Sequence, residues 1–174
     1  MSADSASGSA SGRASGPAEA ALRGATEVAQ VVAAGADRVF AELADGWAYV
    51  GWVVGATHIR DVDEAWPRVG AKIHHMIGLW PAVASDSTES LECEPNRRLL
   101  LRARGWPLGE AIVEIVLTEQ GPSRTTVTMR EAPSAGPAAW LDNPLLRWGL
   151  RLRNVETLKR LKDRVEHRAF PADA

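Results

Sequence analysis

The sequence predicts an α+β domain with an antiparallel sheet of about seven strands, a short helix pair after the first strand, and one long C-terminal helix. Two patterns indicate this order. Short runs of alternating apolar residues are separated by Gly, Pro and Asn, and the end of the chain repeats apolar residues at steps of three and four. A chain of 174 residues is long enough for one well-buried core but short for two domains.

Residues 1–22 are expected to be a disordered tail, and residues 23–170 a single ligand-binding domain. The chain begins "MSADSASGSASGRASGPAEA", and no large apolar residue lies between Met1 and Leu22. Such a segment buries too little surface to offset the entropy lost on ordering. Removing residues 1–20 is therefore expected to leave thermal stability unchanged.

The ordered region begins with a strand and two short helices. "TEVAQVV" (26–32) alternates weakly and is rich in Val, which favours a strand. "GADRVFAELADGW" (35–47) has apolar residues at helical spacing and Gly46 as a stop signal. "WAYVGWV" (47–53) is consistent with a second short helix.

Six more strands are expected to follow as an antiparallel meander. The runs are "ATHIRDVD", "AKIHHMIGLW", "ASDSTESLEC", "RRLLLRARG", "EAIVEIVLTE" and "RTTVTMREA". The segments "PRVG", "EPNR", "WPLG" and "QGPS" have the composition of tight turns.

A long amphipathic helix is predicted from Asp142 onward, with Asp or Asn as its cap and Pro144 in its first turn. Its apolar row is Leu145, Trp148, Leu152, Val155, Leu158, Leu161 and Val165, and we expect the sheet to pack on this row. The other face carries Arg147, Arg151, Arg153, Lys159, Arg160, Lys162 and Arg164. A solvated outer face is favoured over membrane or nucleic-acid contact for these cations.

Composition favours a soluble protein, and a cytoplasmic location is expected. The net charge of −2 gives no electrostatic case for a nucleic-acid partner. The longest stretch without Asp, Glu, Lys or Arg is Gly46–Ile59, too short to span a bilayer, and no secretory signal is expected. No phosphate loop, dinucleotide fingerprint or Ser-His-Asp order is present, so no cofactor is predicted.

Three segments carry a resemblance to a known superfamily. They are "AGADRVFAELADGWAYVGWVVGA", "EPNRRLLLRARGWPLGEAIVEIVL" and "RNVETLKRL". In this order they resemble the START-like, or SRPBCC, superfamily and its polyketide cyclase/dehydrase-like branch, from about Thr26 to Arg168. The resemblance implies a helix-grip fold, in which a curved sheet wraps around the long helix and a cavity between them holds a hydrophobic or amphipathic small molecule. It implies no single chemistry, because this fold hosts carriers, sensors, cyclases and dehydratases.

The adjacent histidines in "KIHHMIGLWP" (72–81) are expected to face opposite ways, because neighbouring side chains alternate across a strand. His75 shares its parity with apolar Ile73 and should point inward, while His74 should point outward. The pair therefore cannot hold one metal ion without a bulge, and Cys93 and the other histidines offer no ligand spacing. No metal site is predicted.

His75 and Glu131 are the candidate acid–base residues. His75 is either a hydrogen-bonded core histidine or a cavity residue that touches the ligand. Val127 and Met129 mark the inner face of "TTVTMRE", so Glu131 lies at the inner end of the last strand, where it is either a buried acid or base or already solvated. They are the only titratable pair for which we propose convergence in one pocket.

The predicted ligand-binding residues are His75, Val113, Ile115, Met129, Glu131 and Asn154. Val113 and Ile115 belong to an apolar wall, while Glu110 and Glu114 on the same strand are expected to face water. Asn154 borders the helical stripe, where its amide either binds ligand or ties the helix to the sheet.

Three functions remain after these exclusions. The first is binding of a lipid-like or polyketide-like hydrophobic molecule in an internal cavity. The alternative is a polyketide cyclase/aromatase or dehydratase in which His75 or Glu131 moves protons. The third is an interaction module that uses the basic helix, favoured only if a continuous basic patch lies beside exposed apolar residues.

Overall fold

A computed structural model describes residues 15–79, 82–105, 109–140 and 143–168. The expectations that concern residues 1–14, Trp80, residues 106–108, Asp142 and residues 169–170 lie outside this part of the chain. The strands are β1 Thr26–Val32, β2 Ala56–Val62, β3 Lys72–Leu79, β4 Ala82–Glu94, β5 Arg98–Gly105, β6 Gly109–Glu119 and β7 Thr125–Ala135. The helices are α1 Ser15–Leu22, α2 Ala36–Ala44, η1 Gly46–Ala48, α3 Tyr49–Trp52, α4 Pro137–Trp140 and α5 Pro144–His167.

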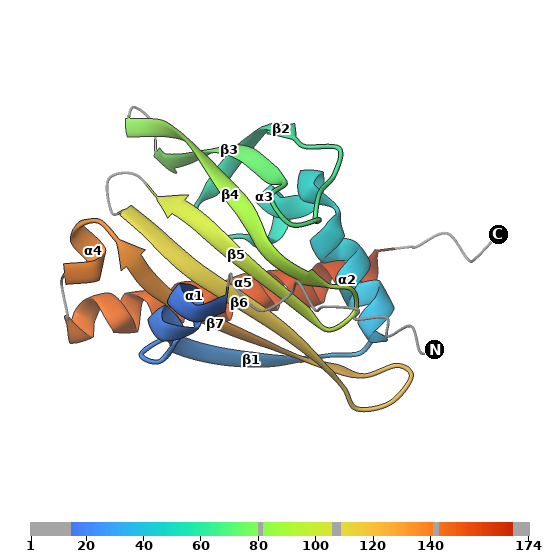
Figure 1. Cartoon of the computed structure of the whole chain (residues 1–174). Helices are drawn as coiled ribbons and strands as arrows, with labels where there is room; N and C mark the ends of the chain where they lie inside the picture. The colour runs from blue at the N-terminus through green and yellow to red at the C-terminus, as the bar shows by residue number, and fades with distance from the viewer. Residues whose placement is uncertain (1–14, 80–81, 106–108, 141–142, 169–174) are drawn as a thin grey trace, which may run out of the picture.

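All seven strands form one antiparallel sheet in the order β1-β7-β6-β5-β4-β3-β2. Strands β2 to β7 are a meander, and β1 pairs with β7 at the far edge. The helices α2 and α3 carry the chain from one edge of the sheet to the other (Figure 1). The long helix α5 runs across the sheet close to β1. The predicted helix-grip architecture, with its helix pair after the first strand, is confirmed.

Local signals in the sequence position the strand ends. Asn96 in the turn "EPNR" has φ +62°, a left-handed conformation that asparagine adopts more readily than most residues. Register shifts interrupt the pairing of β2 with β3, of β4 with β5, and of β6 with β7 at Glu110 and Ala111. Such bulges bend a strand and increase its twist, which lets the sheet curve toward α5.

The main core lies between the inner face of the sheet and the C-terminal half of α5. The sheet contributes alternating residues, including Leu99, Leu101, Val113, Ile115, Val127 and Met129, all at most 7% exposed. Helix α5 contributes Leu158, Leu161 and Val165, each at most 1% exposed.

No helix among the described residues is long and apolar enough to cross a bilayer.

The predicted apolar stripe of α5 is correct only in its C-terminal half. Leu145, Trp148, Leu152 and Val155 are exposed, at 70%, 60%, 49% and 47%. The reason is helical phase. At about 100° per residue, each step of three falls about 60° short of a full turn, so the three steps from Leu152 to Leu161 rotate the row by about half a turn. The inward residues of the first turns are instead Leu146 and Leu150.

Residues 15–22, expected to be disordered, form helix α1, so the predicted tail is wrong for this part. Helix α1 packs on the outer face of the sheet, where Leu22 and Ala18 are buried against Leu100 and Ile112. Leu100 on β5 and Ile112 on β6 form an apolar row on the outer face of the sheet, and α1 shields this row from water.

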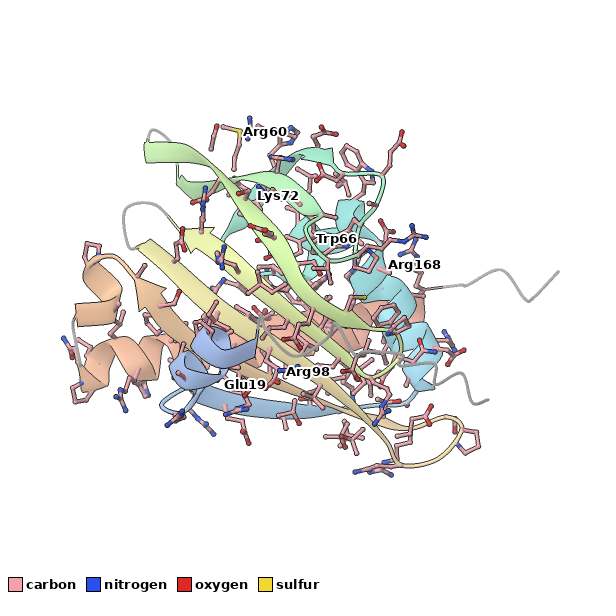
Figure 2. The ribbon with its side chains drawn as sticks, in the orientation of Figure 1. Glu19, Arg60, Trp66, Lys72, Arg98 and Arg168 are labelled. Carbon is pink, nitrogen blue, oxygen red and sulfur yellow. The ribbon has the colours of Figure 1, made fainter. Side chains whose placement is uncertain are left out.

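Ion pairs surround this second contact. Arg98 contacts the carboxylate of Glu19 on α1 (Figure 2). It also contacts the carboxylates of Glu92 on β4 and Glu114 on β6. Arg130 contacts Glu114 as well, at 2.9 Å. Glu114 was expected to face water, but it is only 5% exposed because α1 and these two arginines cover it.

Deleting residues 1–22 is therefore expected to destabilise the protein, in contrast to the expectation from composition. The deletion removes the buried Leu22 and exposes the apolar row beneath it, and a buried leucine side chain contributes about 2–5 kcal/mol. A thermal melt of the shortened chain should show a clear drop in Tm. The exposed-site variant Arg23→Ala is the control and should melt like the wild type; an unchanged Tm on deletion would mean that α1 does not dock.

Candidate functional site

A cavity of about 330 Å³ lies between the inner face of the sheet and the N-terminal half of α5. Its wall is formed by residues of α3 and the segment after it, of strands β2 to β7, and of α5. The lining includes Tyr49, His75, Thr88, Ala103, Glu131 and Arg153.

The cavity exists because inward-facing residues become smaller along two neighbouring strands. On β5 the inner row runs Leu99, Leu101, Ala103, Gly105, and on β6 it runs Ile115, Val113, Ala111, Gly109. The large residues fill the core, whereas the Ala and Gly positions line the cavity. This taper is visible in "LLLRARG" and "GEAIVEI". It is a sequence signal for the cavity's position that appears only when the two strands are compared.

His75, Thr88 and Tyr49 form a hydrogen-bonded group inside the cavity. The His75 Nε2 atom lies 3.0 Å from Thr88 Oγ1, and Tyr49 Oη lies 3.1 Å from the same oxygen. The rings of Tyr49 and His75 stack with centroids 5.6 Å apart. All three residues are buried. Strands β3 and β4 and helix α3 thus bring one imidazole and two hydroxyl groups to one point.

The electrostatics of this group favour uncharged forms. Burial lowers the pKa of His75 below its ordinary value, despite the opposing effect of Asp86. Burial likewise raises the pKa of Tyr49 above its ordinary value. At neutral pH the imidazole is therefore neutral and the phenol keeps its proton, so the group offers hydrogen bonds without net charge.

The lowered pKa of His75 predicts a pH dependence of stability. The unfolded chain binds a proton on this histidine near its ordinary pKa of 6.5, while the folded chain binds it only at lower pH. The contribution of neutral His75 to the free energy of unfolding is therefore complete above about pH 6.5. It is lost as the pH falls from there toward the pKa of His75 in the folded state. Denaturant titrations from pH 7.5 to about pH 5 should show a smaller loss for His75→Asn than for the wild type. Equal losses of stability in His75→Asn and the wild type over this pH range would contradict a lowered pKa of His75.

Two ion pairs account for four charged residues of the lining. Both carboxylate oxygens of Glu131 accept hydrogen bonds from Nη1 of Arg153, each at 3.0 Å, and Arg153 Nε donates to the carbonyl of Val54 at 3.0 Å. Arg104 donates to Glu110 at 3.0 Å. Each pair cancels its own charge, so the cavity presents polar groups without a net charge from these four side chains.

The structure brings some of the predicted site residues together and separates others. His75 and Glu131 both line the cavity. Val113, Ile115 and Met129 are buried in the core and are not part of its lining. Asn154 is fully buried and also lies outside the lining, and within the described residues neither of its amide atoms has a hydrogen-bond partner.

Sequence reasoning missed Tyr49, Thr88 and Arg153. Thr88 lies near His75 because β3 pairs with β4, and Tyr49 reaches both residues through the packing of α3 on the sheet. Arg153 was assigned to a solvated basic face because the stripe of α5 was given the wrong phase at its N-terminal end. Arg153 lies eight residues before the buried Leu161, and this spacing alone does not predict that Arg153 contacts Glu131.

His74 lies outside this site. Its side chain is 34% exposed, and Nε2 is 3.3 Å from Asp63 Oδ1, as the alternation along β3 predicts for an outward residue. In the described part of the chain, no three His, Cys, Asp or Glu side chains are grouped so that they could hold a metal ion.

Comparisons with known proteins identify the fold. No family model matches the chain, and no curated protein matches it. Among solved structures, the ZhuI aromatase/cyclase from Streptomyces sp. R1128 is similar, with a TM-score of 0.63 and 18% identity over 84% of this chain and 96% of the other. A START superfamily protein from Mycobacterium smegmatis has a TM-score of 0.63 and 15% identity, covering 82% of this chain and 97% of the other.

A third similar structure is DynU16, a putative protein of the dynemicin biosynthetic locus. It has a TM-score of 0.60 and 23% identity, and the match covers 82% of this chain and 47% of the other. At these identities the comparisons establish the fold alone. The chain has the START-like helix-grip fold.

Proposed function

We propose that this protein binds a hydrophobic or amphipathic small molecule, lipid-like or polyketide-like, in the cavity between the sheet and α5. The observation that carries the proposal is the taper of β5 and β6, which leaves a cavity of about 330 Å³ beside the packed core. Ligand pockets typically enclose about 300–1,000 Å³, with apolar walls and a few convergent polar groups. This cavity fits the lower end of that range.

The charge balance of the lining supports a neutral ligand. Glu131 is paired with Arg153 and Glu110 with Arg104, and His75 is uncharged at neutral pH. A charged ligand would lose its hydration without gaining an unpaired counter-charge from these residues. A neutral molecule with a carbonyl or hydroxyl group is the better match.

Hydrogen bonding by the lining would orient the polar end of such a molecule. Tyr49, Thr88 and His75 supply hydroxyl and imidazole groups on one wall. Arg153 supplies guanidinium N–H groups on the opposing helix. The apolar part of the ligand would lie against Leu146, Leu150 and the small residues of β5 and β6.

The second candidate function is acid–base catalysis of the cyclase/aromatase or dehydratase type. The presence of two titratable side chains, His75 and Glu131, in one cavity favours it. Neutral His75 has the correct form for a general base. Glu131 is less suited, because its carboxylate is held in an ion pair with Arg153 and accepting a proton would break that pair. Binding therefore remains the first proposal.

Filling the cavity tests the binding proposal. Ala103→Phe places a large ring where the lining is small and should weaken binding of an apolar fluorescent probe by tenfold or more, about 1.4 kcal/mol. Ala29→Phe adds the same ring at an exposed position of β1 and is the matched control. Equal probe affinity in both variants would show that the probe does not enter this cavity. Mass spectrometry of molecules that co-purify with the protein would identify the natural ligand.

His75→Asn separates binding from catalysis. If the cavity only binds, this change removes about one hydrogen bond and alters probe affinity by no more than about tenfold. If the protein is a cyclase or dehydratase, turnover of a polyketide-like substrate should fall by about 10²–10⁴ while the ligand still binds. Loss of the histidine limb of the pH–rate profile in this variant would replace the binding proposal with the catalytic one.

A further inference from the structure

The N-terminal half of α5 has two apolar faces. Leu146 and Leu150 face inward and line the cavity. On the opposite side, Leu145, Trp148, Leu152 and Val155 are 47–70% exposed, and we call these four residues the outer seam. Four large exposed apolar residues in consecutive turns of one helix are more than the scattered single ones that soluble surfaces carry.

The spacing of the outer seam is three, four and three residues. This is the a/d spacing of two heptads, the pattern with which one helix packs its side chains against another. On a helical projection the four residues span only about 80°, narrower than the stripe of about 100° or more that faces a broad apolar surface. The shape of the seam therefore favours a helix as its occupant over a flat lipid surface.

The residues after the seam limit its length. Lys159 and Lys162 occupy the next a and d positions. Two copies of a lysine facing each other would repel, so helix pairing through this row ends at Val155.

The charges beside the seam match those of a second copy in a parallel arrangement. Arg151 holds the g position of one heptad and Glu156 the e position of the next. In a parallel helix pair, the g residue of one helix faces the e residue five positions later on the other, which brings Arg151 of each copy to Glu156 of the other. Within one copy, Glu156 uses one carboxylate oxygen to pair with Arg160, and Arg151 donates from Nη1 to the carbonyl of Glu27, so the contact between copies uses the remaining oxygen and N–H groups. A two-fold axis along the helices makes two such opposite-charge contacts.

We propose that the outer seam is a homodimer interface, in which α5 of one copy packs in parallel on α5 of a second copy. The two domains lie on opposite sides of the helix pair, because the buried face of α5 is turned away from the seam. Four side chains make a contact smaller than the standard interface of about 1,200–2,000 Å². The dimer is therefore reversible and concentration-dependent.

Sedimentation equilibrium of the full-length chain, at concentrations up to about 1 mM, tests the proposal. The wild type should show a monomer–dimer equilibrium. Leu152→Asp and Trp148→Asp should each raise the dissociation constant at least tenfold, without changing the Tm measured at low concentration. Trp47→Asp is the matched control, because Trp47 is 58% exposed but lies on η1, and it should dimerise like the wild type.

Charge reversal tests the parallel arrangement. Arg151→Glu and Glu156→Arg should each weaken the dimer, and the double variant should restore it because the opposite signs are exchanged. A wild type that stays monomeric over the whole range overturns the proposal. The proposal is also overturned if the monomer sediments with anionic phospholipid vesicles and Trp148→Asp abolishes this binding, because the outer seam would then be a membrane contact. Equal weakening by Trp47→Asp would place the interface elsewhere and overturn it as well.

Discussion

Replacing Leu161 by Asp is expected to abolish cooperative folding, whereas the same replacement at Leu152 is expected to leave the folded state intact. Leu161 is fully buried in the core between α5 and the sheet, and Leu152 is 49% exposed on the other side of the same helix. Burying an unpaired carboxylate, together with the lost apolar contacts, costs more than about 4 kcal/mol. That is comparable to the whole stability of a domain, about 5–15 kcal/mol.

Far-UV circular dichroism and thermal melts of the two variants check this contrast. The measurements are made at low protein concentration, so that self-association does not contribute to the Tm. The two variants introduce the same charge on one helix, so any general effect of Asp on helix propensity is shared. If Leu152→Asp unfolded the protein and Leu161→Asp did not, α5 would turn Leu152, not Leu161, toward the sheet.

Replacing Arg153 by Met is expected to destabilise the protein by about 3 kcal/mol, because it leaves the buried carboxylate of Glu131 without its partner. Broken buried pairs typically cost about 3–5 kcal/mol, and the partial exposure of Arg153 places this pair at the lower end. The loss should appear as a lower denaturant midpoint with an unchanged slope.

A double variant separates the lost charge pair from lost packing. Arg153→Met/Glu131→Leu removes both charges and should recover most of the stability lost by Arg153→Met. Arg160→Met on the same helix breaks only the exposed pair with Glu156 and should change stability little. If Arg153→Met were as harmless as Arg160→Met, Glu131 would be hydrated rather than paired inside the cavity.

Two residues of the candidate site, His75 and Glu131, could be predicted from local pattern. The inward direction of His75 and the outward direction of His74 follow from the two-residue repeat of a strand, and the structure confirms both. The inward direction of Glu131 follows from Val127 and Met129 in the same way. The partners of these residues could not be predicted, since Thr88, Tyr49 and Arg153 come from other elements whose positions depend on how the sheet curves.

The sequence by itself determined the order of the seven strands and of helices α2, α3 and α5, the strand parity and the fold. These depend on turn residues and on a repeat of two, which tolerates no drift. Tertiary structure alone decided that α1 covers the outer apolar row, that α5 turns Leu152 outward and Arg153 inward, and that the cavity lies at the small-residue ends of β5 and β6. The physical reason is that an α-helix has 3.6 residues per turn. A row of apolar residues spaced at three and four therefore changes its direction gradually along the helix. Which part of that row is buried depends on the surface that the helix meets.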